Sequence, residues 1–257
     1  MRGLQIVVTV GLFLLIPIIL SGNNNTAVQL AGIRIVGPGS GLNGNELQAF
    51  HQQSGTTLAL VIHAPGNKKI VEVDDDKCSL KTFTDNQEND LLDGIDWSGF
   101  PKISEDGRSA LIEVTSKNRP SMGAEKLHVR GSVYLRVAAS EYTDRIENMT
   151  LKTGTKVMVG QEAIQVMKTE IDNENLTIVL QISQSLKNNM KDIRFYSLSG
   201  QELEIWGRGS FTFGSVSQME YNLDTNTIPE FLNIEIDIWK ELENSDLPFE
   251  IEAGIGF

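Results

Sequence analysis

The sequence is poor in the residues on which several common site chemistries depend. It contains one cysteine, Cys78, so no disulfide can form within the chain and a cysteine-based zinc site is excluded. Its three histidines, His51, His63 and His128, are far apart and show no metal-ligand spacing. We therefore expect hydrophobic cores, or a bound metal, to hold the chain together, with His63 and His128 on the outer faces of strands.

Recognisable catalytic motifs are missing as well. The sequence contains no HExxH, no Gly-x-Ser-x-Gly and no Cys–His motif. Gly39, Gly41 and Gly44 have the spacing of a dinucleotide-binding loop, but no β-α-β unit follows them, so a turn is the better interpretation. Serines are plentiful, which leaves a Ser–His–Asp triad assembled in space as an open alternative. The absence of motifs favours a protein that is not an enzyme.

Positive charge and aromatic side chains are both scarce. Lys and Arg number 22 against 34 Asp and Glu, which gives a formal net charge of −12. Such a chain is a poor partner for nucleic acid, whose phosphates must be neutralised by cations. Aromatic residues make up 7% of the chain, fewer than we expect for a sugar-binding cleft. Trp97 and Phe100 are candidate ligand-binding residues, with packing in a core as the alternative.

A positive charge followed by an apolar run opens the chain. Arg2 precedes the uncharged stretch Leu4–Leu20, the pattern of a secretory signal. The apolar part is shorter than the roughly 20 residues of a membrane-spanning helix, and Pro17 interrupts it. No Ala-x-Ala cleavage site follows. We expect residues 1–22 to be a cleaved signal peptide or an uncleaved membrane anchor, and the protein to be exported to the periplasm, cell surface or medium.

Alternation of apolar and polar residues dominates the remaining sequence. It is clearest in Leu127–Ala138, where Gly131 suggests a bulge, and it recurs in Leu176–Ile182 and in residues 247–257. No convincing amphipathic helix of ten or more residues is present, and Ser183–Lys191 is either a short helix or a loop. Many short strands separated by turns predict an all-β fold.

The length and order of these strands indicate how the chain is divided. We predict two consecutive antiparallel β-sandwich domains of immunoglobulin-like architecture, residues 23–139 and residues 140–257, because each half is close to a typical domain size. Each half contains an alternating strand, a turn-rich connection and a long closing strand. On this division the C-terminal strand 247–257 belongs to the second domain, and its removal is expected to unfold that domain.

An acidic, irregular stretch between residues 85 and 101 is the best candidate for a site. Calcium binds six to eight oxygen ligands, which carboxylates on irregular loops can supply. The spacing is not that of an EF-hand, and a solvated acidic loop without metal is the alternative. A second acidic run, Asp74–Asp76, precedes this stretch. The candidate calcium ligands are Asp85, Asp90, Asp93 and Asp96.

These features predict an exported, non-enzymatic β-sandwich protein that acts as a binding or structural module. Its partner would be a protein or a carbohydrate, and it would contact a membrane only through the N-terminal segment. The alternative is a secreted hydrolase that cleaves a polymer with carboxylates of the acidic loop, since paired carboxylates are the machinery of glycoside hydrolysis. No cofactor is expected apart from the candidate calcium.

Overall fold

The computed structural model describes residues 27–37, 54–97, 100–172, 175–225 and 228–255. The expected signal or anchor, the glycine-rich turn and His51 lie outside this part of the chain. The described part is nearly all β, with antiparallel pairing, which confirms the predicted all-β fold. One short α-helix, α1 (Gln184–Asn189), forms where the sequence left helix and loop open. No helix in the described ranges has the length and apolar character needed to cross a membrane.

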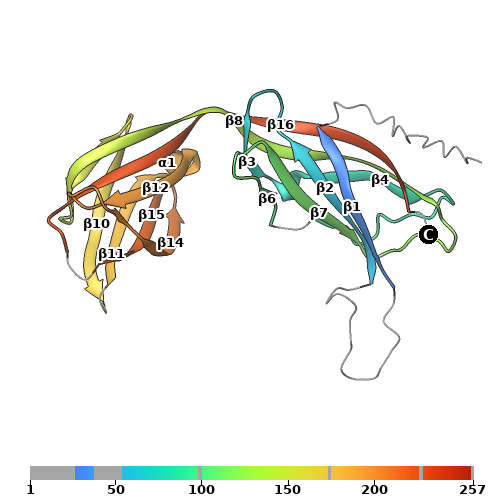
Figure 1. The fold of residues 1–257 in the computed structure, drawn as a ribbon, viewed down its shortest axis with the longest axis horizontal. Helices are drawn as coiled ribbons and strands as arrows, with labels where there is room; N and C mark the ends of the chain where they lie inside the picture. Colours follow the sequence, from blue (N-terminus) through green and yellow to red (C-terminus); the bar gives the residue numbers. More distant parts are fainter. Residues whose placement is uncertain (1–26, 38–53, 98–99, 173–174, 226–227, 256–257) are drawn as a thin grey trace, which may run out of the picture.

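The strands are arranged in two lobes, each with its own hydrophobic core (Figure 1). In the first lobe one sheet has the order β1-β2-β7-β5, with β6 also paired to β7. The facing layer consists of β3, β4 and parts of the long strands β8 and β16, next to the 3₁₀ turn η2 (Asp75–Lys77). The bounds are β1 Val28–Val36, β2 Gly55–His63, β3 Lys69–Val73, β4 Ser79–Asp85, β5 Asp96–Trp97, β6 Lys102–Ile103, β7 Ser109–Ser116, β8 Lys126–Thr150 and β16 Phe231–Gly254.

The second lobe pairs a five-stranded sheet with the remaining parts of the long strands. The five-stranded sheet has the order β14-β15-β11-β10-β9, and β12 and β13 extend the layer that contains β16 and β8. Helix α1 begins after Ser183, whose hydroxyl accepts a hydrogen bond from the Leu186 N–H as an N-cap. The bounds are β9 Lys156–Val159, β10 Glu162–Asp172, β11 Asn175–Ser183, β12 Met190–Tyr196, β13 Glu202–Leu203, β14 Ile205–Phe213 and β15 Val216–Asp224.

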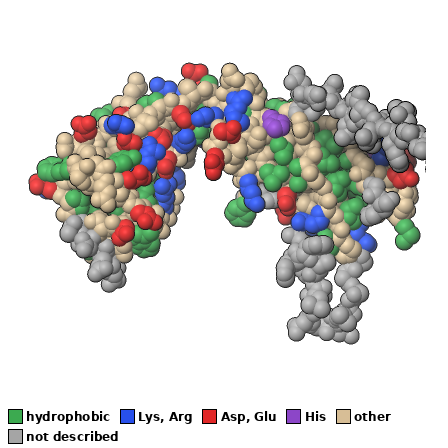
Figure 2. All heavy atoms as spheres, in the orientation of Figure 1, with side chains coloured by type: hydrophobic (Ala, Val, Ile, Leu, Met, Phe, Trp, Pro, Cys, Tyr) green, Lys and Arg blue, Asp and Glu red, His purple; other side chains and the backbone are tan. Residues whose placement is uncertain are grey.

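Strands β8 and β16 run through both lobes as one antiparallel pair. Their register extends from Phe231 opposite Thr150 to Gly254 opposite Lys126. The predicted strand 127–138 is therefore half of a longer strand, and the predicted C-terminal strand 247–257 is the end of a strand that begins at Phe231. Figure 2 shows the narrow bridge that the pair forms between the lobes.

The C-terminal residues pack in the first core, and the expectation that they stabilise the second half is wrong. Phe249 and Ile255 belong to the cluster formed by residues of β2, β7 and β8. The reason is geometric: a strand that pairs antiparallel with the end of β8 in the second lobe must continue beside the beginning of β8 in the first. The division at residues 139 and 140 stays a prediction. The second core is built from residues between 142 and 238, whereas the first combines residues 28–137 with the C-terminal Phe249 and Ile255.

Charged side chains join the lobes where the long strands cross between them. The Glu141 carboxylate accepts hydrogen bonds from the ammonium groups of Lys191, at 2.7 Å, and Lys69, at 2.9 Å. These two cations hold the Glu141 pKa below its usual value. Lys191 also lies 4.9 Å from the centre of the Trp239 ring. Lys69 belongs to the first lobe and Lys191 to the second, so Glu141 links both.

Gly131 provides a test of the bulged pairing in the first lobe. A Cβ atom at this position would overlap the Ser79 carbonyl oxygen and lie 3.1 Å from the Phe249 ring. We expect Gly131→Ala to lower the free energy of unfolding by about 1–3 kcal/mol, because the core cannot accept the added atom without shifting backbone. Gly32→Ala is the control, since nothing lies within 4 Å of its Cβ position. Equal denaturant midpoints for the two variants would contradict the close approach.

Candidate functional site

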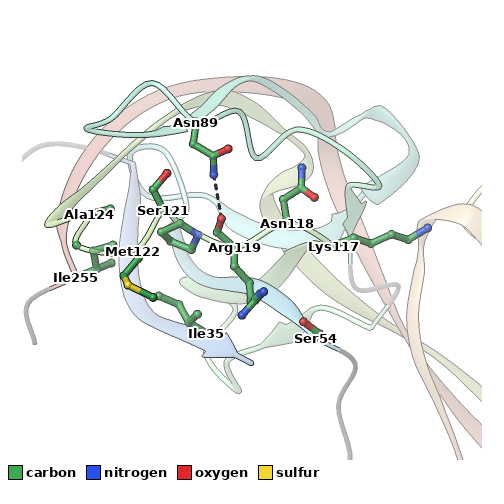
Figure 3. Close-up of a pocket in the computed structure, with 12 residues that line it drawn as sticks. Ile35, Ser54, Asn89, Lys117, Asn118, Arg119, Ser121, Met122, Ala124 and Ile255 are labelled. Atoms are coloured by element: carbon green, nitrogen blue, oxygen red, sulfur yellow. Dashed lines mark hydrogen bonds between the residues drawn. The ribbon is translucent and has the colours of Figure 1, made fainter. Parts of the chain in front are cut away.

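A hollow of about 750 Å³ opens at one end of the first lobe (Figure 3). It lies where the β7–β8 connection, residues 117–125, meets the β4–β5 connection and the end of β1. One side is polar and the other apolar. The polar lining residues are Ser54, Asn89, Lys117, Asn118, Arg119 and Ser121, and the apolar ones are Ile35, Pro120, Met122, Ala124 and Ile255, with Gly123 between them.

Asp85 links the two connections that form the hollow through hydrogen bonds to its carboxylate. Its side chain is buried, and its Oδ1 accepts hydrogen bonds from the backbone N–H groups of Gln87, at 2.8 Å, and Asn89, at 3.0 Å. Its Oδ2 accepts a third, from the Ser121 N–H at 2.6 Å in the other connection. Burial acts to raise the Asp85 pKa, but these N–H donors outweigh it and hold the pKa below its usual value.

Side-chain amides fix the β7–β8 connection further. Asn89 donates from Nδ2 to the Arg119 carbonyl at 3.0 Å, the contact drawn in Figure 3. Asn118 donates from Nδ2 to the Asp90 carbonyl at 3.2 Å, and the Asn86 Oδ1 accepts from the Glu125 N–H at 2.9 Å. The backbone that carries the two cations of the hollow is thus held on several sides by hydrogen bonds, as a preorganised site requires.

Lys117 and Arg119 are exposed cations at the hollow. Figure 3 shows Arg119 extending between Ile35 and Ser54, while the Lys117 side chain points away from the other lining residues. Within the described ranges neither side chain has a carboxylate within ion-pair distance. In a chain of net charge −12, these two cations give the described lining a local positive charge, which favours an anion.

The four predicted calcium ligands are not gathered into a metal site in the described part of the chain. Asp85 has its oxygens directed at three backbone N–H groups, and Asp90 accepts from the Leu92 N–H at 2.9 Å. Asp93 and Asp96 are exposed. Among the residues with described positions, no three His, Cys, Asp or Glu lie where they could hold a metal ion. Calcium binding therefore stays a prediction from sequence.

The two aromatic candidates, Trp97 and Phe100, differ in how far they are buried. Trp97 lies in β5 opposite Val114 and packs, half-buried, against the first core. Phe100 is 89% exposed, and neither residue lines the hollow. His63 and His128 are exposed on strands, as predicted, with His63 Nδ1 at 3.0 Å from the Ser109 hydroxyl. Ligand binding by Trp97 and Phe100 stays a prediction.

The residues of the hollow were missed because the sequence shows them as a turn. Lys117-Asn118-Arg119 stands before Pro120, in a stretch that any β protein could use to connect two strands. One signal was available: two cations separated by one residue are uncommon in so acidic a chain. The burial of Asp85 and its bond to Ser121 had no sequence signal, because they join residues 36 positions apart.

Comparisons with known proteins add no family to this description. The chain matches no family model, and no curated protein or solved structure is significantly similar to it. The fold and the site define an antiparallel all-β protein with a cationic hollow at the loop end of one lobe.

Proposed function

We propose that this chain is an exported, non-enzymatic binding module that recognises an acidic carbohydrate through the hollow of its first lobe. Its lobes would be two β-sandwich domains of immunoglobulin-like architecture, exported by the N-terminal segment or tethered by it. The observation that carries the proposal is the pair Lys117 and Arg119, exposed at the hollow without a carboxylate partner in the described part of the chain. Loops on a rigid β scaffold commonly carry recognition.

The chemistry of the lining favours an acidic sugar over a simple anion. The Arg119 guanidinium is suited to a carboxylate or a sulfate, which it can bind through two N–H groups. Asn118 and Ser121 add amide and hydroxyl groups that can exchange hydrogen bonds with sugar hydroxyls. Ile35, which is partly exposed, and Met122, which is 99% exposed, offer an apolar surface for the C–H face of a ring. The described lining contains no Asp or Glu, and a glycoside hydrolase would need a pair of carboxylates there.

The test is calorimetric titration with oligogalacturonate and dextran sulfate, with neutral dextran as the uncharged comparison. We expect one of the two acidic saccharides to bind and dextran not to bind. The double variant Lys117→Gln/Arg119→Gln should weaken binding at least tenfold, about 1.4 kcal/mol, because it removes both charge-assisted contacts. The protein's overall negative charge opposes adventitious attraction of polyanions.

The matched control is Lys152→Gln/Lys156→Gln, which removes the same charge from two exposed lysines of the second lobe. It should bind like the unmodified chain. Equal loss in both double variants, or no binding of either acidic saccharide, would refute the proposed recognition. Release of new reducing ends from either saccharide would show a hydrolase instead.

A further inference from the structure

Strand β14 is an edge strand that leaves its aromatic side chains in solvent. It pairs with β15 on one side, and no other described strand pairs with its outer edge. Trp206 is 59% exposed, Phe211 67% and Phe213 77%. A long strand edge with exposed apolar side chains is a template for pairing with another strand.

The other edges in the described structure are protected in ways that β14 is not. β5, β6 and β13 are two residues long, and β9 has four. β3 and β4 have five and seven residues, but each carries a lysine and buries an apolar side chain, Ile70 or Phe83, in the first core. β1 has nine residues, as β14 does, but its Leu30, Ile33 and Ile35 pack against the first core. β14 contains no proline and one charged residue, Arg208. Its bulge, between Ile205 and Gly207, and its one charge, Arg208, both lie in its first half. Residues 209–213 therefore form an edge without proline, bulge or charge.

The outer face of β14 alternates glycine with phenylalanine. Gly209 and Phe211 lie opposite Glu220 and Gln218 of β15, which are exposed, so all four share the outer face. The strand itself does not require glycine at 209, because a Cβ atom there would make an ordinary 3.5 Å contact and the backbone does not have positive φ. A glycine inside a strand without such a local reason suggests close approach of another group.

We propose that β14 pairs antiparallel with β14 of a second copy of this chain, about a two-fold axis through Ser210. In this register Phe211 lies opposite Gly209 of the partner and Phe213 opposite its Gly207. Each exposed phenylalanine ring then covers a glycine, a pairing known to favour strands. The strand is thus complementary to itself, as a two-fold interface requires.

Charge is compatible with the same register. Arg208 would lie opposite the partner's Thr212, so the two arginines do not face each other. Within its own chain Arg208 donates to the Asp192 carboxylate at 3.0 Å, which neutralises it. The Ser210 pair at the axis is uncharged. No like-charge contact between directly opposite residues opposes dimer formation.

The first test is sedimentation equilibrium of the full chain in density-matched detergent, from about 1 to 100 µM. We expect a reversible dimer, and Phe211→Glu should raise its dissociation constant at least tenfold by placing a charge over glycine. Met158→Glu is the control, because Met158 is 59% exposed on β9 at the opposite edge of the same sheet. A monomer throughout, or a dimer that Phe211→Glu leaves unchanged, would overturn the proposal.

The second test fixes the register by cross-linking. In a Cys78→Ser background, Ser210→Cys places two thiols opposite each other at the axis, and mild oxidation should link most of the protein as dimers. Thr212→Cys faces Arg208 of the partner, so it should cross-link at least fivefold less. The pair Thr212→Cys and Arg208→Cys, mixed as two separate chains, should link as heterodimers. Equal cross-linking by Ser210→Cys and Thr212→Cys would refute the register.

Discussion

Removal of residues 247–257 is expected to unfold the first lobe and leave the second lobe folded. The deleted segment includes the part of β16 that pairs with β8 from Val133 to Lys126. Phe249 and Ile255 are buried in the first core, and Leu247 and Ile251 pack against it. The second core takes its β16 residues from Leu232 to Ile238, upstream of the deletion.

The size of the effect follows from the apolar surface that is lost. Burying side chains such as Phe249 and Ile255 contributes about 1.5–3 kcal/mol each. The half-buried side chains and the lost strand pairing add to this, and a whole domain is stable by only about 5–15 kcal/mol. Amide hydrogen exchange should therefore show loss of protection in β2 and β7, with β10 and β11 protected as before.

A single substitution distinguishes the effect of lost core packing from the effect of removing the end of the chain. Phe249→Ala should lower the free energy of unfolding of the first lobe by about 3 kcal/mol, since it leaves a cavity beside Gly131. Phe100→Ala makes the same change at a phenylalanine that is 89% exposed and should shift stability by less than about 0.5 kcal/mol. If the truncated chain lost protection in β10 and β11 instead, the assignment of the C-terminus to the first core would be wrong.

Asp85→Asn is expected to destabilise the first lobe by about 2–4 kcal/mol and to abolish saccharide binding at the hollow. The amide of Asn cannot accept from Ser121, Gln87 and Asn89 together: its one oxygen replaces two, and its NH₂ group would face an N–H donor. A buried N–H then lacks a partner, and the two connections that form the hollow separate. Thermal unfolding and the saccharide titration measure the two effects.

The effect of Asp85 depends on pH with a defined sign. Its pKa is lower in the folded protein than the usual value of about 3.9 in an unfolded chain. The carboxylate therefore contributes its full stability above the unfolded pKa and loses it as pH falls through the folded pKa. The stability difference between the unmodified chain and Asp85→Asn should be constant from pH 7 to about 5 and shrink below about pH 4.

Asp90→Asn is the matched control in the same connection. The Asp90 carboxylate is exposed and accepts from the Leu92 N–H, with a second oxygen free to be solvated. This substitution should cost less than about 1 kcal/mol and leave saccharide binding in place. A destabilisation as large as that of Asp85→Asn, or no pH dependence in the Asp85 comparison, would show that the three N–H contacts do not organise the loops.

The sequence was most informative where a pattern is local. The alternation of Leu127, Val129, Val133 and Leu135 with polar residues does not fit the period of a helix, so the strand content and the all-β class follow from it. In the structure all four side chains are buried in the first core. The same holds for Leu176–Ile182, whose inward residues are buried in the second core. The short helix after Ser183 depends on a cap three residues from its donor, and the sequence left helix and loop open there.

The candidate site could be located only in part from sequence. The acidic stretch from residue 85 does form one wall of the hollow, through Asn89, but its carboxylates do not supply the lining. The sequence predicts Asp85 as a metal ligand because carboxylates in loops bind cations. In the structure its carboxylate instead accepts hydrogen bonds from three backbone N–H groups. The cations Lys117 and Arg119 belong to a different connection, between β7 and β8. They lie near Asn89 only because the tertiary structure brings the ends of β7 and β4 together.

The strands, their faces and the acidic character of the chain follow from the sequence alone, because these depend on neighbours one or two residues apart. Which strands pair, and which core each one joins, depends on long-range contacts. Phe249 lies opposite Gly131 because β8 and β16 continue past the junction without changing partners, 118 positions apart in sequence. Alternation tells which side chains are inward but carries no information about the partner strand, so the assignment of the C-terminus required the register of the long pair.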